Sequence, residues 1–237
     1  MLNRILFMKT IGLIGGMSWE SSAEYYRLIN EEVRNRLGST HSAKSLMWSM
    51  DFAEIETLQH EGNWQALSEK MCQAAVSLER GGADFIVICT NTMHKLAEQV
   101  QACLNIPLLH IADATAKEIT SKNIKKVGLL GTEFTMKQDF YKGRLADKFG
   151  LEVFIPNDED CQIVHLIIYQ ELVAGVIRDE SRQQYRQIIQ KLVDAGAEAI
   201  ILGCTEIMLL VSPADSAVPV FDTTEIHAQA AVNMALA

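Results

Sequence analysis

Three segments in the first half of this 237-residue chain recur in its second half, in the same order and about 114 residues later. Each pair shares an apolar run that ends in glycine or small polar residues: IGLIGG (11–16) with VGLLGT (127–132), ADFIVICTNT (83–92) with AEAIILGCTE (197–206), and IPLLHIAD (106–113) with VPVFDTTE (218–225). Any α/β protein can show an apolar strand followed by glycine, but three matches in one order favour a duplicated unit. We therefore expect two similar halves.

Strand-like and helix-like patterns alternate along the chain. In the first half, apolar runs at 11–16, 43–50 and 83–90 are separated by helical spacing at 22–38 and 63–82. Strand and helix in alternation indicate parallel sheets covered by helices on both faces. The predicted fold class is α/β, with two pseudo-symmetric domains. Each is expected to be a doubly wound parallel-sheet sandwich, and the active site is expected in the cleft between them, at the carboxyl ends of the strands.

The repeat also suggests where the domains begin and end. We expect residues 8–105 together with 218–237 to form the first α/β domain, and residues 106–217 to form the second. The opening residues resemble a signal peptide only faintly, so residues 1–7 are expected to be a disordered extension, with Met8 as a possible initiator.

Composition excludes several classes of partner. The net charge is −9 and no basic cluster is present, which argues against nucleic-acid binding. No apolar run has the roughly 18–20 residues that a membrane span needs. The five cysteines are odd in number and form no CxxC pair, which argues against a disulfide framework or a zinc ribbon and favours a reducing, cytoplasmic location. They are Cys72, Cys89, Cys103, Cys161 and Cys204.

Two of the repeated strands end in side chains able to move protons. Cys204 follows the buried run that begins at Ala197, and the same alignment places Thr90 at the equivalent position of the first half. Backbone N–H groups beyond a strand end can lower a thiol pKa and bind a carboxylate. The alternative readings are an inert core cysteine and a threonine that only caps a helix. Cys89 alternates with Thr90 along the strand, so it is expected to face the core.

The remaining polar signals are weaker. Gly15-Gly16-Met17-Ser18 matches neither a dinucleotide-binding fingerprint nor a P-loop; it suits a tight turn beside a small anion or, equally, a helix cap at Ser18. The six histidines are scattered without metal-ligand spacing, so no metal site is predicted. His94 and His110 are expected to have hydrogen-bonded structural roles, with a supporting role near the active site as the alternative.

Five stretches of the chain resemble the aspartate/glutamate racemase superfamily, most closely its aspartate racemase branch: IGLIGGMSWESSAEYY, GGADFIVICTNTMH, PLLHIADAT, VGLLGT and ILGCTE. The resemblance implies racemisation without pyridoxal phosphate or any other cofactor. In that superfamily two opposed residues flank the substrate α-carbon, usually one cysteine in Cys-Asn-Thr and another in Gly-Cys-Thr. Here Gly203-Cys204-Thr205 is intact, but the first motif reads Thr90-Asn91-Thr92.

A threonine and cysteine pair is similar to that of L-aspartate/glutamate-specific racemases. The resemblance implies that Cys204 removes the α-proton of one enantiomer, with preference for the L form, and that Thr90 returns or relays a proton. It also implies a homodimer. Residues 149–177 contain no Lys or Arg to recognise a side-chain carboxylate, so broader amino-acid specificity stays open. The substrate-binding residues implied are Met17, Ser18, Gln59, Asn91, Thr92, Thr132 and Thr205.

Two other functions fit the same residues. A single-cysteine decarboxylase or isomerase of the superfamily, similar to arylmalonate decarboxylases and maleate isomerases, would use Cys204 alone. A non-catalytic amino-acid-binding protein would keep ligand binding when Cys204 is replaced by alanine, whereas a racemase would lose turnover.

Overall fold

The protein contains two four-stranded parallel sheets with the same strand order, in a computed structural model that describes residues 8–38 and 40–237. The first sheet has the order β2-β1-β3-β4 and the second the order β6-β5-β7-β8. The strands that were matched in the sequence occupy equivalent places in the two sheets, so the predicted α/β class with duplicated halves is confirmed. Residues 1–7 lie outside the described part of the chain.

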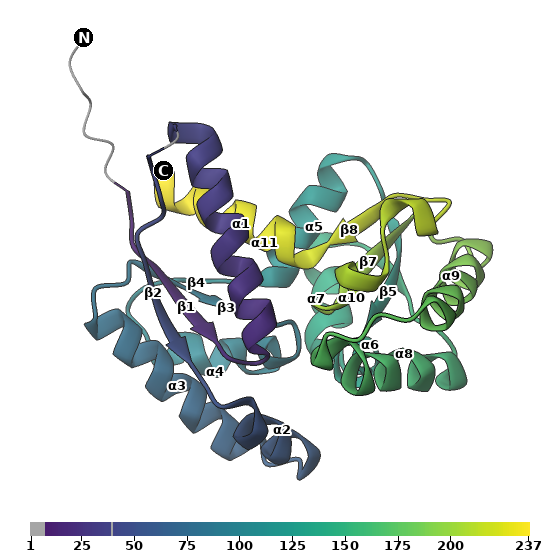
Figure 1. Ribbon diagram of the computed structural model, residues 1–237, viewed down its shortest axis with the longest axis horizontal. Helices are drawn as coiled ribbons and strands as arrows, with labels where there is room; N and C mark the ends of the chain where they lie inside the picture. The colour runs from purple at the N-terminus through teal and green to yellow at the C-terminus, as the bar shows by residue number, and fades with distance from the viewer. Residues whose placement is uncertain (1–7, 39) are drawn as a thin grey trace. The chain divides into compact units, whose positions relative to one another are not determined.

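The first unit comprises the described residues up to Cys89, Leu96–His110 and His227–Ala237. Its elements are β1 (Ile11–Gly15), α1 (Trp19–Leu37), β2 (Ser45–Ser49), α2 (Phe52–His60), α3 (Trp64–Arg80), β3 (Phe85–Ile88), α4 (Ala97–Ala102) and β4 (Leu108–Leu109), and it takes the end of α11 (Thr223–Leu236). In Figure 1, α1 crosses one face of β1 and β3, and α3 lies against the opposite face.

The core of this unit follows from strand alternation. Leu13 of β1 and Val87 of β3 point to the face that α1 covers with Tyr25, Ile29 and Val33, and all five side chains are fully or almost fully buried. α1 begins at an N-cap, Ser18, and ends before a positive-φ glycine, Gly38.

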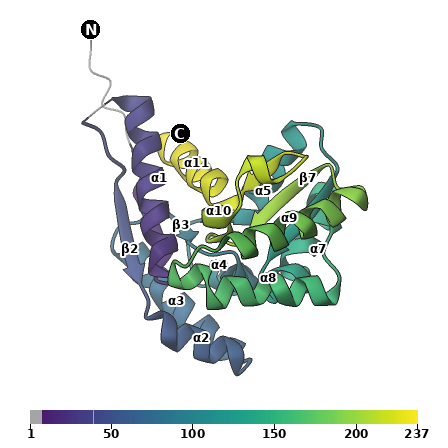
Figure 2. The same ribbon diagram turned by 45° about the vertical axis from the view of Figure 1, so that its right-hand side comes forward.

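The second unit comprises Thr90–Lys95 and Ile111–Ile226. Its elements are α5 (Ile111–Ser121), β5 (Lys126–Gly131), α6 (Glu133–Lys137), α7 (Asp139–Phe149), β6 (Glu152–Phe154), α8 (Asp158–Gln170), η2 (Leu172–Ala174), α9 (Asp179–Asp194), β7 (Ala199–Gly203), α10 (Ile207–Leu210), η3 (Pro213–Asp215), β8 (Val220–Asp222) and the start of α11, and the short helix η1 (Thr92–Leu96) begins in it. α8, α9 and α10 pack with Leu130 and Leu202 on one sheet face, whereas α5 and α7 pack with Leu129 and Ile201 on the other. Figure 2 shows α8 and α9 together beside β7.

The strand pairing corrects the expected domain boundaries of 8–105 with 218–237 and 106–217. β4 pairs with β3, so residues up to His110 stay with the first sheet, and β8 pairs with β7, so residues up to Ile226 stay with the second. Each edge strand joins the strand that precedes it in the chain, because hydrogen bonds to that neighbour satisfy its backbone. After these edge strands the chain changes unit at α5 and within α11, and the segment Thr90–Lys95 is an earlier, short excursion into the second unit.

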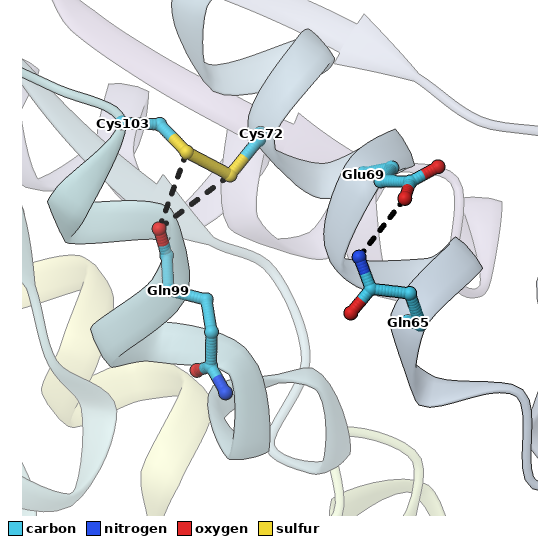
Figure 3. Close-up of a disulfide and its surroundings, with 5 residues drawn as sticks. All are labelled: Gln65, Glu69, Cys72, Gln99 and Cys103. Carbon is cyan, nitrogen blue, oxygen red and sulfur yellow. Dashed lines mark hydrogen bonds between the residues drawn. A yellow bond between two sulfur atoms is a disulfide. The ribbon is translucent and has the colours of Figure 1, made fainter.

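The cysteine pattern argues against a disulfide framework, but the structure contains a disulfide. Cys72 on α3 and Cys103 at the end of α4 are bonded, with their Cα atoms 5.9 Å apart (Figure 3). That separation lies inside the range a disulfide requires. Sequence spacing gave no indication of it, because the pair is separated by 31 residues and meets only where α4 packs on α3. The other three cysteines are free and buried.

No helix in the described part of the chain combines the length and the apolar character needed to cross a membrane.

Candidate active site

The candidate site lies where three neighbouring strands of the second sheet end. β5, β7 and β8 are parallel neighbours, so their carboxyl ends share one sheet edge. Thr132, Cys204 and Thr223 each follow directly after one of these strands. The short segment Thr90–Lys95 belongs to the same unit. The fold therefore gathers hydroxyl and thiol groups at the edge where ligands bind in open parallel sheets.

The Thr90 segment is tied to this edge by a relay of two hydrogen bonds. Asn91 Nδ2 donates to Thr223 Oγ1 at 3.0 Å, and the Thr223 hydroxyl donates to the Leu202 carbonyl at 2.7 Å. Leu202 lies on β7, two residues before Cys204. The relay therefore connects the residue next to Thr90 with the strand that carries Cys204.

A second contact joins the segment to the end of β5. Thr92 Oγ1 and Thr132 Oγ1 are 3.1 Å apart, and Thr132 Oγ1 also accepts from the backbone N–H of Thr135 as the N-cap of α6. All three side chains are buried. Of the predicted binding residues, Asn91, Thr92 and Thr132 are thus brought together within one hydrogen-bonded group.

Two glycines let β5 and β7 end close together. A Cβ on Gly131 would lie 2.8 Å from the Gly203 carbonyl oxygen, and a Cβ on Gly203 would lie 2.8 Å from the Leu130 carbonyl oxygen. Both clashes are with backbone that the sheet holds in place. The glycines before Thr132 and Cys204 are therefore required by the packing of this edge.

His94 fixes the backbone of Thr90. The N–H of Ile111 donates to His94 Nε2 at 3.2 Å, so the proton of the neutral ring sits on Nδ1 and is donated to the Thr90 carbonyl at 2.7 Å. Thr90 itself is 9% exposed, so a small reactant at its side chain would meet little bulk water. His94 has the hydrogen-bonded structural role expected from the sequence, and it acts on the candidate site.

Cys204 has a carboxylate as its immediate partner. Its thiol donates to Glu206 Oε2 at 3.0 Å, and Thr205 Oγ1 donates to the same oxygen at 2.6 Å. Burial is the largest cause that raises the thiol pKa well above its ordinary value, and the Glu206 charge adds to it. Hydrogen bonds from the backbone N–H groups of Glu206 and Ile207 lower the thiol pKa, but by less than burial and the Glu206 carboxylate raise it.

This corrects the expectation that the strand-end position lowers the pKa of Cys204. The resting group is a thiol hydrogen-bonded to a carboxylate, not a thiolate. Thr205 is also engaged, because its hydroxyl donates its proton to Glu206. Glu206 is a candidate site residue that the sequence did not single out, although it lies in the motif ILGCTE.

Asn91 leaves one buried acceptor without a donor among the described residues. The Thr223 hydroxyl already donates to Leu202, so it can only accept from Asn91, and this fixes the amide with Nδ2 toward Thr223. Asn91 Oδ1 therefore faces away from Thr223, and it is buried without a hydrogen-bond partner. A buried amide oxygen without a donor costs about 1–3 kcal/mol, which a ligand N–H group would recover.

The other predicted binding residues belong to the first unit. Met17 and Ser18 follow β1, and Gln59 lies on α2; all three are buried. Ser18 Oγ accepts from the Ser21 N–H at 3.3 Å, so the alternative reading of Ser18 as a helix cap is confirmed. The Gly16 N–H is already used by Ser22 Oγ at 2.7 Å, which removes one donor from the proposed anion turn.

Across residues 8–38 and 40–237, no three or more His, Cys, Asp or Glu side chains are grouped so that they could hold a metal ion.

Comparison with known proteins identifies the family of this chain. The family model described as Asp/Glu/hydantoin racemase matches residues 14–231. The broad specificity amino-acid racemase RacX of Bacillus subtilis is 27% identical over 96% of this chain and 98% of its own length.

Two solved structures are similar over nearly the whole chain. A candidate Asp/Glu racemase from Yersinia pestis is 55% identical, with a TM-score of 0.92 over 97% of this chain and 100% of that one. An aspartate racemase homologue from Pyrococcus horikoshii OT3 is 37% identical, with a TM-score of 0.84 over 96% of this chain and 99% of that one. The fold and these relatives show that the protein is an isomerase of the racemase class. The chain belongs to the Asp/Glu/hydantoin racemase family.

Proposed function

We propose that this racemase inverts the α-carbon of an amino acid, and that its substrate is aspartate or glutamate. Cys204 and Thr90 are its two proton-transfer groups, and it uses no cofactor. One observation carries the proposal: the segment Thr90–Asn91–Thr92 is hydrogen-bonded to Thr132 after β5 and to Thr223 after β8. Thr223 bonds in turn to Leu202 of β7, two residues before Cys204. A thiol and a hydroxyl are thereby supported by one hydrogen-bonded framework.

On the cysteine side, Glu206 acts as the base for the thiol. The Cys204 proton passes to Glu206 Oε2 across the existing 3.0 Å hydrogen bond when substrate is bound. The thiolate then takes the α-proton of the substrate, which leaves a carbanion. Since burial and the Glu206 charge destabilise the thiolate, it forms as a strong base and returns readily to the thiol form.

On the threonine side, the Thr90 hydroxyl delivers a proton to the opposite face of the carbanion. The resulting alkoxide recovers its proton from solvent, and Glu206 loses its own to solvent, so the cycle closes with no net change in protons. A threonine hydroxyl is a poor base at neutral pH, so kcat is lower for the enantiomer whose α-proton Thr90 must remove. The pair therefore favours one substrate hand, and we assign Cys204 to the L enantiomer.

Asn91 Oδ1 is the group we assign to the substrate ammonium. It is buried, without a donor, and its orientation is fixed by the relay through Thr223. Asn91 directly follows Thr90 in the chain, so an ammonium bound there is held by the residue next to the proposed proton donor. We further assign substrate contacts to Met17, Ser18, Gln59, Thr92, Thr132 and Thr205.

The substrate range includes a second possibility, favoured by the relative with broad specificity. Residues 149–177 offer no cation for a side-chain carboxylate. A panel of acidic, neutral and basic amino acids therefore belongs in the assay. The proposal of aspartate or glutamate fails if neutral or basic amino acids turn over faster.

The test is a chiral chromatographic assay of each enantiomer with wild type, Thr90→Ala and Cys204→Ala. Wild type should form the opposite enantiomer, and both variants should lose inversion while still binding substrate in calorimetry. A Cys204→Ala variant with undiminished inversion would overturn the proposal. Unchanged binding with no inversion by the wild type would identify an amino-acid-binding protein instead.

We also propose that the enzyme is a homodimer, as the family resemblance implies, and that it is cytoplasmic, as the odd number of cysteines without a CxxC pair suggests. Light scattering on the purified protein and fractionation of cells test these two statements separately.

A further inference from the structure

The disulfide between α3 and α4 has one accessible end. Cys103, directly after α4, is an exposed residue, whereas Cys72 in the middle of α3 is half-buried. Figure 3 shows both sulfurs beside the Gln99 carbonyl, at 3.5 Å from Cys72 and 3.3 Å from Cys103. A disulfide sulfur has no proton to donate, but in the dithiol form either S–H group would find this carbonyl as its acceptor. Both redox states therefore have a compatible environment.

We propose that Cys72 and Cys103 form a reversible redox switch that fastens α4 to α3, and that small thiols and disulfides exchange with it through Cys103. The proposal does not depend on the racemase activity.

The first unit has a core and hydrogen bonds that hold it together besides this disulfide. A core of fully buried side chains already covers its sheet. The segment after α4 has other ties: the Asn105 N–H donates to Glu79 Oε1 of α3 at 2.9 Å, and Gln101 bonds to the backbone of Ile106 and Leu108. A disulfide added to a segment that is already held is suited to regulation, whereas small domains that depend on disulfides lack such a core.

The position of the bond gives the switch a specific target. The loop it closes, residues 72–103, contains β3, the segment Thr90–Thr92 and α4. The bond thus anchors the helix that follows the proposed proton-transfer segment along the chain. Opening it returns conformational freedom to α4 and to the residues around it.

The chemistry balances as two thiol–disulfide exchanges. A thiolate, such as that of glutathione, attacks the Cys103 sulfur; a mixed disulfide forms on Cys103 and Cys72 leaves as a thiolate. A second glutathione thiolate releases glutathione disulfide and the Cys103 thiolate, and both protein thiolates then take protons from water. Two electrons pass from glutathione to the protein.

The first experiment equilibrates the full-length protein with glutathione and glutathione disulfide at a series of ratios. Acid quenching, alkylation and peptide mass spectrometry then report each cysteine. The switch predicts that Cys72 and Cys103 convert together, while the buried Cys89 and Cys161 stay reduced at every ratio. Two persistent thiols in glutathione disulfide alone, or a bond that excess glutathione leaves intact, would overturn the proposal.

The second experiment separates the two sulfurs. Glutathione disulfide should modify Cys103 in Cys72→Ser at least about tenfold faster than it modifies Cys72 in the matched Cys103→Ser variant, since thiol exchange follows access. Equal rates would contradict entry through Cys103.

Hydrogen exchange gives a structural readout. Reduction should increase amide exchange at residues 96–105 and leave α9 unchanged, and it should lower Tm by about 10 °C. The Cys72→Ser/Cys103→Ser double variant should have the amide exchange and Tm of the reduced wild type. Neither quantity should change with the ratio of glutathione to glutathione disulfide. Equal amide exchange at residues 96–105 in the two redox states would show that the disulfide does not restrict the motion of α4.

Discussion

Cys204 and Glu206 share a 3.0 Å hydrogen bond in which the thiol donates to the carboxylate, two residues apart on the loop that follows β7. Both side chains are buried, at 9% and 5% exposure. The same carboxylate raises the pKa of the thiol and offers it the nearest proton acceptor. Glu206 therefore lowers the fraction of Cys204 that is ionised and also provides the acceptor for its proton.

Glu206→Gln should make the Cys204 thiol easier to ionise and should also remove the base that accepts its proton. The variant loses the negative charge, so the pKa of Cys204 falls and alkylation of Cys204 begins at lower pH. It also loses the base, so kcat should fall by about 100-fold or more while KM changes little. The matched control is Glu159→Gln, an exposed residue in the first turn of α8, which should change neither quantity. A Glu206→Gln variant with normal kcat would contradict the proposed base.

Thr223 is predicted to hold the Thr90 segment through its hydroxyl. Thr223→Val keeps the shape but leaves Asn91 Nδ2 and the Leu202 carbonyl without their partner. We expect a loss of about 2 kcal/mol in the free energy of unfolding, together with reduced turnover. Thr223→Ser retains the hydroxyl and should recover both in urea titration and assay. Equal behaviour of the two variants would show that the relay has no role.

The sequence was informative where burial alone decides structure. β1, β3, β5 and β7 are continuous apolar runs, as strands covered on both faces must be, and their repetition gave the duplicated fold. Edge strands carry a weaker signal. The sequence could not show that Leu108–Leu109 stays with the first sheet and Val220–Asp222 with the second, because only the hydrogen-bonded partner decides this.

The sequence predicted which residue types form the candidate site, but not the protonation state of Cys204. The motif placed Cys204 and Thr205 at a strand end, yet the direction of the Glu206 side chain, which reverses the expected pKa shift, depends on the turn after β7. Thr223 had no signal of its own beyond its place after a strand. The bond between Cys72 and Cys103 needed the packing of two helices to become visible.

His227 should make the protein less stable in mild acid. Its Nδ1 accepts from the Tyr25 hydroxyl at 2.8 Å and its Nε2–H donates to the Leu109 carbonyl at 2.9 Å, which requires a neutral ring. Burial lowers its pKa from 6.5 to about 4. Between these values the unfolded chain binds a proton that the folded chain does not, so stability is full above pH 6.5 and falls toward pH 4, by about 3 kcal/mol in total.

Urea titrations from pH 7.5 to pH 4.5 measure this contribution as the difference between wild type and His227→Gln. The variant should be less stable at neutral pH but have a shallower pH dependence. Parallel curves would contradict the buried neutral histidine.

Gly16 is predicted to be irreplaceable in the turn after β1. Its φ is +83°, and an added Cβ would lie 2.2 Å from the Met50 carbonyl oxygen. Gly62 also has positive φ, +68°, but a Cβ there meets nothing within 4 Å. Gly62→Ala should therefore cost about 1 kcal/mol for backbone conformation alone, whereas Gly16→Ala should cost about 3 kcal/mol or more. Denaturant unfolding of both variants measures the difference, and equal losses would show that the close approach is relaxed.

The most direct test of two-sided proton transfer is α-proton exchange in deuterium oxide, followed for each enantiomer by NMR and chiral analysis. The account predicts faster deuterium uptake from the L enantiomer in wild type, no uptake from it in Cys204→Ala, and uptake without inversion in Thr90→Ala. Equal uptake from both enantiomers in wild type, or inversion by Thr90→Ala at the wild-type rate, would contradict it.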